Sequence, residues 1–390
     1  MHFIRRLFAP NIQKLAANKD VESLIDALES KNPQIIATAK KALLEMGVEA
    51  VEGLILALEH PSDEVSNIAF ELLEAVGPAS IIPLREQLRY GSGYIRRISP
   101  WLLGNIGSDH KEAVSSASIV PELIRALTYE DDTLRQNAAS ALGKLSDPLA
   151  IEPLCRALSD PVSAVVRNAA WAIAQLLSDL DNPQDHAAAT PALLERLNQA
   201  EDNDMRTFLL SALSSLAPAS LEHAMGMMDR SNQETSAAVV AFVALFARAG
   251  HSQALEALVR GLQHDIMSNR LRVVYAMADI SDERVVAALN RFCEVAGGEE
   301  QLAATQTLVN LGQPAPLRLL AGHFRELLTQ TTGQKIMAAK KQGHTPDHEE
   351  MLTQVLSELH AEFKNRFKLS AQDMRSLISL AFPDAPGVDA

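Results

Sequence analysis

Apolar residues recur along most of the chain at the i, i+3, i+4 and i+7 spacing of amphipathic helices. The helical segments come in pairs, an entry segment followed by a second, Ala-rich segment, as in AVEGLILALEH and VSNIAFELLEAVG. The second segments end at a regular interval, because Gly47, Gly77 and Gly107 stand thirty residues apart. The pattern therefore predicts about nine two-helix units between residues 20 and 312.

Proline positions agree with this division into helices. Pro33, Pro61 and Pro161 fall in the expected turns between the two helices of a unit, where a missing backbone N–H costs nothing. A two-helix unit of this size cannot bury its apolar face alone, so it must stack on its neighbours. The sequence predicts an all-α fold, a right-handed α-solenoid with one continuous core and a helical C-terminal appendage.

The pattern divides the chain into three parts. Residues 1–19 form a lead-in, residues 20–312 carry the repeated units, and residues 313–390 carry helical segments without the repeat. In the last part, Glu349–Phe367 is strongly amphipathic and Ser370 is placed to cap a final helix. We favour a capping role for this appendage, because the last repeat needs its apolar face covered. A mobile arm that docks elsewhere is the alternative.

Two joints between units are longer than the rest. Residues 108–118 and 180–190 each insert about ten residues, after the third and the fifth unit. Insertions in a stack of repeats fall on its edge, and we interpret both as tolerated loops. Because they flank the fourth and fifth units, the alternative is that they border a binding site.

The fourth and fifth units also carry a family resemblance. The phrases AIEPLCRALSDP and VRNAAWAIAQL resemble HEAT repeats, in particular the phycobilisome-lyase-like HEAT family. The resemblance covers roughly residues 20–312. It implies an interaction scaffold built as an α-solenoid, and for some members of the family a bilin lyase.

Composition and charge narrow the partner class. Hydrophobic residues make up 47% of the chain and aromatic residues only 4%, which predicts a core of Ala, Leu, Ile and Val. The net charge is −14, and residues 1–313 carry the whole acidic excess, with 26 Lys/Arg against 40 Asp/Glu. An acidic body repels phosphate backbones, so we expect no specific nucleic-acid partner.

The cysteines and the sequence motifs bear on the cellular compartment and on catalysis. Cys155 and Cys293 lie far apart and form no CxxC motif, which favours a reducing, cytoplasmic setting. A run of about eighteen apolar residues, as a membrane span requires, does not occur. The chain lacks G-x-S-x-G, P-loop and G-x-G-x-x-G motifs. HEAT-like deoxyhypusine hydroxylases hold two irons with several His-Glu pairs, and here only His348-Glu349 occurs. We therefore predict no catalysis, no metal and no cofactor.

Aligning the second helices of the units on a shared apolar position reveals a candidate binding surface. Both tryptophans of the chain then fall in one column, in the third and fifth units, with a serine between them. One turn earlier stand two arginines and a glutamine, and Arg and Trp at i,i+4 share a helix face, which predicts cation–π pairs. We call these residues the predicted patch: Arg97, Trp101, Gln136, Ser140, Arg167 and Trp171.

The predicted patch is expected on the concave side of the solenoid, where the second helices lie. Trp and Arg are the commonest interface hot spots, so we predict that it binds a protein segment carrying acidic and apolar groups. The partner's identity and the oligomeric state stay open. Four further arginines recur one step after the aligned position and are expected to be structural, in ion-pair ladders between units: Arg96, Arg135, Arg206 and Arg270.

Three alternatives remain at this point. Both tryptophans pack inward between units; or the groove holds a tetrapyrrole, as in a bilin lyase; or the C-terminal appendage is the active part. In the last case Lys335, Lys340 and Lys341 would reach an acidic partner or a membrane.

Overall fold

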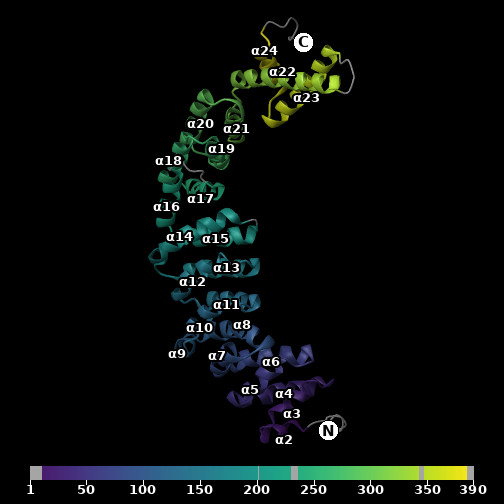
Figure 1. The fold of residues 1–390 in the computed structure, drawn as a ribbon, viewed down its shortest axis with the longest axis vertical. Coiled ribbons are helices and arrows are strands. Elements are labelled where there is room, and N and C mark those ends of the chain that lie inside the picture. Colours follow the sequence, from purple (N-terminus) through teal and green to yellow (C-terminus); the bar gives the residue numbers. More distant parts are fainter. Residues whose placement is uncertain (1–10, 201, 230–235, 342–346, 384–390) are drawn as a thin grey trace. The chain divides into compact units, whose positions relative to one another are not determined.

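The computed structural model describes residues 11–200, 202–229, 236–341 and 347–383. Throughout these residues the regular structure is helical, with no strand (Figure 1). The chain divides into two compact units, Met1–Ser220 and Leu221–Ala390, here called unit 1 and unit 2. Each is a stack of helix pairs, so the predicted all-α solenoid fold is confirmed.

Unit 1 begins with α2 (Ile12–Ala17) and continues as six helix pairs. The first helices are α3 (Val21–Ala27), α5 (Val48–Ala57), α7 (Ile81–Tyr90), α10 (Ile119–Ala126), α12 (Ile151–Ala157) and α14 (Thr190–Gln199). The second helices are α4 (Pro33–Met46), α6 (Asp63–Val76), α8 (Gly93–Asp109), α11 (Asp132–Leu145), α13 (Ser163–Asp179) and α15 (Asn203–Ser215). Within unit 1, Figure 1 shows second helices along one side and first helices along the other.

The helix ends follow from local chemistry. The Asn32 side chain caps α4 by accepting a hydrogen bond from the backbone N–H of Gln34, at 3.0 Å, and Pro33 occupies the first turn. Gly47 and Gly77 end α4 and α6 with φ values of 57° and 70°, a backbone conformation that favours glycine. Gly107, expected to end a helix in the same way, lies inside α8, which continues to Asp109.

Small residues bring α8, α11 and α13 unusually close together. A Cβ added at Gly104 of α8 would lie 2.7 Å from the Cα of Ala141 in α11. A Cβ at Gly143 of α11 would lie 2.8 Å from the Cα of Ala172 in α13. We call these four positions the seam. Because no side chain separates the backbones there, the seam fixes the spacing of the three helices.

Both long joints form short helical segments. The first contains α9 (Lys111–Ser116), which contacts α10 and α8, and Figure 1 shows it beside α10. The second contains η3 (Pro183–Ala189), a 3₁₀ segment that contacts α12 and α14. The two insertions therefore extend the side of the first helices. The alternative that they border a binding site stays a prediction, because α9 also contacts α8, a second helix.

One stretch of the described residues, Asp63–Tyr90, is long and apolar enough to cross a membrane by length and composition. It is not a continuous helix, because η1 (Gly77–Ser80) separates α6 from α7. Leu73, Ile81 and Leu84 of this stretch are buried in unit 1. Its apolar residues thus serve the core of two successive repeats.

Unit 2 continues the pairing. Its helices are α16 (Ala219–Met228, which starts just before the boundary), α17 (Ala237–Arg248), α18 (Ser252–Gly261), α19 (Met267–Ala276), α20 (Glu283–Val295) and α21 (Gly298–Asn310). These three pairs and the six of unit 1, counted over the described residues, agree with the predicted nine.

Three more helices follow: α22 (Leu317–Lys341), α23 (His348–Arg366) and α24 (Ala371–Ala381). Phe324, Phe363 and Phe367 form the centre of their shared core. Leu302 of α21 belongs to the same core, so these helices pack against the last repeat of unit 2. The predicted cap at Ser370 is present as a capping box with Asp373.

Candidate functional site

The predicted patch lies on α8, α11 and α13, three second helices that contact one another in succession. All six of its residues are at least partly exposed. Of the arginine side chains, 41% of Arg97 and 53% of Arg167 is exposed. Both tryptophans are half-buried, so neither packs wholly inward between repeats.

The two patch arginines do not pair with the tryptophans of their own helices. Arg97 lies 3.6 Å from the carboxylate of Asp131, and Arg167 lies 3.0 Å from that of Asp202. Asp131 and Asp202 are the N-cap residues of α11 and α15, so each arginine reaches the start of the following second helix. The expected stacking of Arg on Trp at i,i+4 is therefore wrong. The ion pairs win because they neutralise both charges.

Trp101 is held by neighbours on both adjacent helices. Its ring centroid lies 4.5 Å from that of Phe70 in α6, and the Lys144 Nζ of α11 lies 4.6 Å from the ring centroid. Lys144 also donates to Asn105, whose amide donates to Glu74 at 2.5 Å. Burial lowers the pKa of Lys144, and the Glu74 carboxylate partly offsets this. Trp101 thus has its aromatic and cationic partners within unit 1.

Trp171 has a different environment. Its Cζ3 lies over Gly143 of the seam, only 2.6 Å from where a Cβ would stand. Within the described residues, neither an aromatic ring nor a cation contacts the Trp171 ring. The positions that correspond to Phe70 and Lys144 hold the small residues Ala139 and Ser215.

The Trp171 indole N–H is also unused. It donates to no protein group in the part of the chain that the structure describes, and it is not one of the buried polar atoms lacking a partner. The indole nitrogen is therefore not fully buried. Trp171 combines an unpaired ring with a free donor, as interface tryptophans commonly do.

Two asparagines that sequence reasoning missed hold the patch helices in register. Asn137 donates to the backbone carbonyl of Arg97 at 2.7 Å, and Asn168 donates to that of Gln136 at 3.0 Å. Both stand at the same aligned position, in QNAAS and RNAAW, so the shared asparagine was the available signal. These bonds satisfy carbonyls between neighbouring helices and align their backbones.

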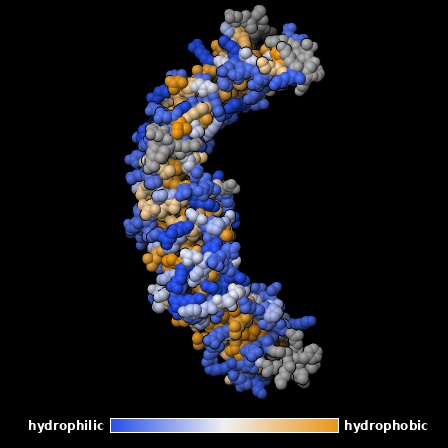
Figure 2. Space-filling view, viewed as in Figure 1, coloured by the Kyte–Doolittle hydropathy of each residue, from blue (hydrophilic) through white to orange (hydrophobic). Residues whose placement is uncertain are grey.

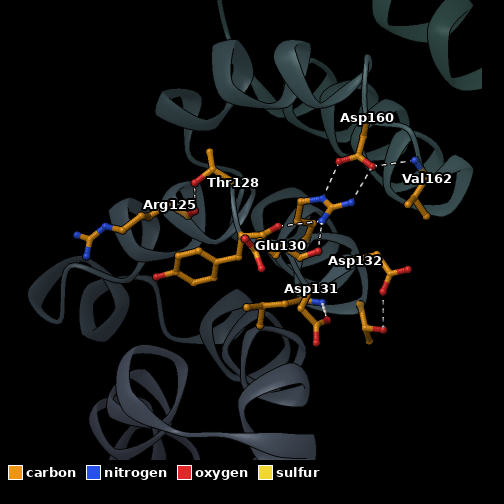
Figure 3. A network of polar contacts seen from close by, with 11 residues as sticks. Arg125, Thr128, Glu130, Asp131, Asp132, Asp160 and Val162 are labelled. Atoms are coloured by element: carbon orange, nitrogen blue, oxygen red, sulfur yellow. Dashed lines mark hydrogen bonds and ion pairs between the residues drawn. The ribbon is translucent and has the colours of Figure 1, made fainter.

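The four arginines expected in ion-pair ladders all bind backbone carbonyls, but among the described residues only Arg135 and Arg270 form ion pairs between repeats, with Asp160 and Glu300. Arg135 donates to the backbone carbonyls of Tyr129 and Glu130, and it pairs with Asp160 at 2.7 Å. Figure 3 shows Asp160 between this guanidinium group and the backbone N–H of Val162. The other three bind the preceding turn in the same way: Arg96 to the Leu88 carbonyl, Arg206 to that of Ala200 and Arg270 to that of His264.

The two cysteines are poor nucleophiles in this structure. Burial raises the pKa of the Cys155 thiol to about 11 and also raises that of Cys293, which disfavours thiolate nucleophiles. No group of three or more His, Cys, Asp or Glu side chains that could hold a metal occurs among the described residues. In unit 2, Lys335 of the alternative C-terminal site forms an ion pair with Glu358 at 2.7 Å.

Two open pockets lie between successive first helices. One, of about 530 Å³, lies between α10 and α12, and the other, of about 430 Å³, between α18 and α20. Neither is lined by the second helices that carry the predicted patch. Figure 2 shows unit 1 with polar and apolar side chains interspersed on the face in view. The patch is an open surface, which suits a macromolecule better than an enclosed small molecule.

Comparison with known families identifies the repeats. A profile for HEAT repeats matches residues 81–174 and 120–214, the region of α7 to α15. The helix pairs that carry the predicted patch therefore lie in the region that matches HEAT repeats. The match does not distinguish the phycobilisome-lyase-like subfamily. No match was found among curated proteins.

Several solved structures are similar to the chain. An engineered protein is 18% identical, covering 93% of this chain and 98% of that one with a TM-score of 0.39. A designed armadillo repeat protein in complex with the peptide (KR)4 is 21% identical, with 50% and 99% covered and a TM-score of 0.36. YibA of Escherichia coli is 15% identical, with 69% and 96% covered and a TM-score of 0.37. Likeness at this level carries no argument about function.

Proposed function

We propose that the chain is a non-catalytic scaffold or adaptor that binds a protein partner on the second-helix face of unit 1, at the predicted patch. The observation that carries the proposal is Trp171, a half-exposed indole with an unpaired ring and a free N–H on HEAT repeats. Tryptophan and arginine dominate the binding energy of protein interfaces.

The geometry of the patch supports a macromolecular partner. Packed helices are spaced by about 10 Å, so Trp101 and Trp171, two helices apart, are separated by about 20 Å. A stable protein interface covers about 800 Å² on each partner, a scale that this spacing matches. The seam and the hydrogen bonds of Asn137 and Asn168 hold α8, α11 and α13 in place before binding. This lowers the entropy cost of ordering the surface when a partner binds.

The proposal includes a cytoplasmic location and a protein partner, without nucleic acid. Both cysteines are free thiols, as expected in a reducing compartment. The acidic excess of residues 1–313 supports the exclusion of nucleic acid.

Affinity capture from the native host tests the proposal. The full chain, the W101A/W171A variant and the control L149A would be used as bait, with mass spectrometry to identify bound proteins. Leu149 is 69% exposed in η2 (Pro148–Ala150), the 3₁₀ segment before α12, so its loss removes apolar surface outside the second helices. We expect the double variant to lose a specific partner by about tenfold or more, and the control to retain it.

Undiminished capture by a double variant with normal helical content and cooperative unfolding contradicts the proposal. The bilin lyase alternative makes a separate prediction. It requires that the purified chain acquire visible absorbance on incubation with a bilin.

A further inference from the structure

The two tryptophans of the patch differ in whether the chain itself places a cationic side chain on the ring. At Trp101 the chain provides it, as Lys144 from the following helix, and adds Phe70 from the preceding one. At Trp171 the corresponding positions are Ser215 and Ala139, and neither can make such a contact. The same structural position is thus completed internally in one repeat and left incomplete two helices later.

We infer that the protein segment bound at the patch places a lysine or arginine side chain on the Trp171 ring, while a carbonyl of that segment accepts the indole N–H. This inference rests on the proposed function and names the chemistry of its partner. A cation on an exposed indole is favourable, and more so once the partner excludes water.

The carboxylate of Asp179 supplies charge complementarity along the same row of α13. Trp171, Gln175 and Asp179 follow one another at intervals of four residues, so Asp179 lies about 12 Å from Trp171 along the helix axis. Ser146 donates to Asp179 at 2.7 Å and Gln175 donates at 3.1 Å. Asp179 is exposed and provides a second contact for a basic segment.

An acidic segment finds no unpaired cation among the patch residues; beyond the patch, Lys111 of α9 acts electrostatically on the Asp179 carboxylate. Arg97 and Arg167 are already paired with Asp131 and Asp202. Lys144 is half-buried and committed to the Trp101 ring and to Asn105. The sequence-based expectation of an acidic partner segment relied on those arginines being free. The net charge of −14 further favours the approach of basic segments.

Indole N–H resonances of the full chain test the inference. The chain has two tryptophans, so its ¹H–¹⁵N spectrum contains two indole signals, which the W101F and W171F variants assign. The probes are three short unfolded peptides of equal length that carry two lysines, two glutamates or two glutamines four positions apart. In extended chain that spacing spans about 13 Å, close to the distance from Trp171 to Asp179.

We expect the lysine peptide to shift the Trp171 signal and leave the Trp101 signal nearly unchanged. Its Kd should rise about fivefold in W171A and by less in W171F, because phenylalanine keeps an aromatic face. It should also rise with salt, and in D179N. The L149A control should bind as the unmodified chain does.

Three results overturn the inference. One is a glutamate peptide that shifts the Trp171 signal more than the lysine peptide does, which would leave the proposed function standing. Another is lysine-peptide binding that is equally strong in W171A, since the peptide then binds elsewhere. The last is the absence of any shift of the Trp171 signal with all three peptides. The capture experiment judges the proposed function independently, because its bait variants lose partners of any charge.

Discussion

The α8–α11–α13 stack of unit 1 and the α22–α24 bundle of unit 2 bury apolar surface in different ways. In the stack, the closest contacts are made by glycine and alanine, with Gly104 against Ala141. In the bundle, they are made by aromatic rings. Phe324 and Phe363 meet edge to face with centroids 4.9 Å apart, and Phe363 lies 5.3 Å from Phe367.

The difference reflects how many neighbours each helix has. A helix inside the stack has a similar helix on both sides, so small residues suffice and the backbones approach closely. The bundle is not built of the two-helix repeat, and its three helices fill a shared centre with large side chains. Close backbone approach keeps the helices of the stack aligned, whereas aromatic packing fills the centre of the bundle.

The largest expected effect is on the bundle. Phe363 is 2% exposed between two other rings, and F363A should cost about 4 kcal/mol of unfolding free energy through the cavity it leaves. Hydrogen exchange during urea titration would follow α22–α24 and α8–α13 separately. F363L, which retains most of the volume, is the control. Equal loss of protection in both regions would show that they do not differ as described.

Glycine-to-alanine substitutions should change the unfolding free energy in opposite directions in the stack and in the bundle. G104A places a methyl group 2.7 Å from the Ala141 Cα and should destabilise the stack by about 2 kcal/mol. G322A in α22 meets no atom within 4 Å and should stabilise the bundle by up to about 1 kcal/mol. Urea unfolding of both variants measures the two changes. Stabilisation by G104A would mean that the seam has spare room.

Acid should weaken the repeats around α10 of unit 1 more than the bundle. Glu122 of α10 has 3% of its side chain exposed, and its hydrogen bond with Arg89 holds its pKa below the usual value. The stability it provides is full above the ordinary glutamate pKa of about 4.3 and is lost as pH falls through the lower folded-state pKa. In the bundle, the pKa values of Glu358 and Asp373 are also lowered, but Glu358 is exposed and Asp373 only partly buried, so these groups matter less.

Unfolding free energies measured in steps from pH 6 to pH 3 test this. We expect the repeats around α10 to lose about 1 kcal/mol more stability than the bundle. E122Q should remove part of the slope for α7–α10 and leave α22–α24 unchanged. A steeper slope in the bundle contradicts the assignment.

Much of the fold could be predicted because its signals are local. The 3.6-residue periodicity and the glycines at Gly47 and Gly77 depend only on neighbouring residues, and they place α4 and α6 correctly. The prediction that Gly107 ends a helix was wrong, because a glycine at a helix end and a glycine at a close contact look alike in sequence. A Cβ there would lie 2.5 Å from Leu145 and 2.6 Å from Val114, a tertiary fact that no local pattern contains.

The exposure of the patch residues could be predicted from the sequence, whereas their contacts with neighbouring helices could not. Alignment of the second helices correctly put Trp101 and Trp171 on half-exposed rows of α8 and α13. It did not identify Lys144 as the cation on Trp101, since that contact joins residues one turn apart in the alignment. Such pairs depend on how far neighbouring helices are shifted along their axes. That shift cannot be read from a single sequence.

The seam has a consequence for reuse of this surface. The close approach of α8, α11 and α13 is set by hydrogen atoms and methyl groups at Gly104, Ala141, Gly143 and Ala172, and their register is held by Asn137 and Asn168. The three helices therefore constitute a cassette in which the exposed residues outside these contacts are exchangeable without altering its pitch. New specificities are best sought by randomising the outer rows while these four small residues stay constant.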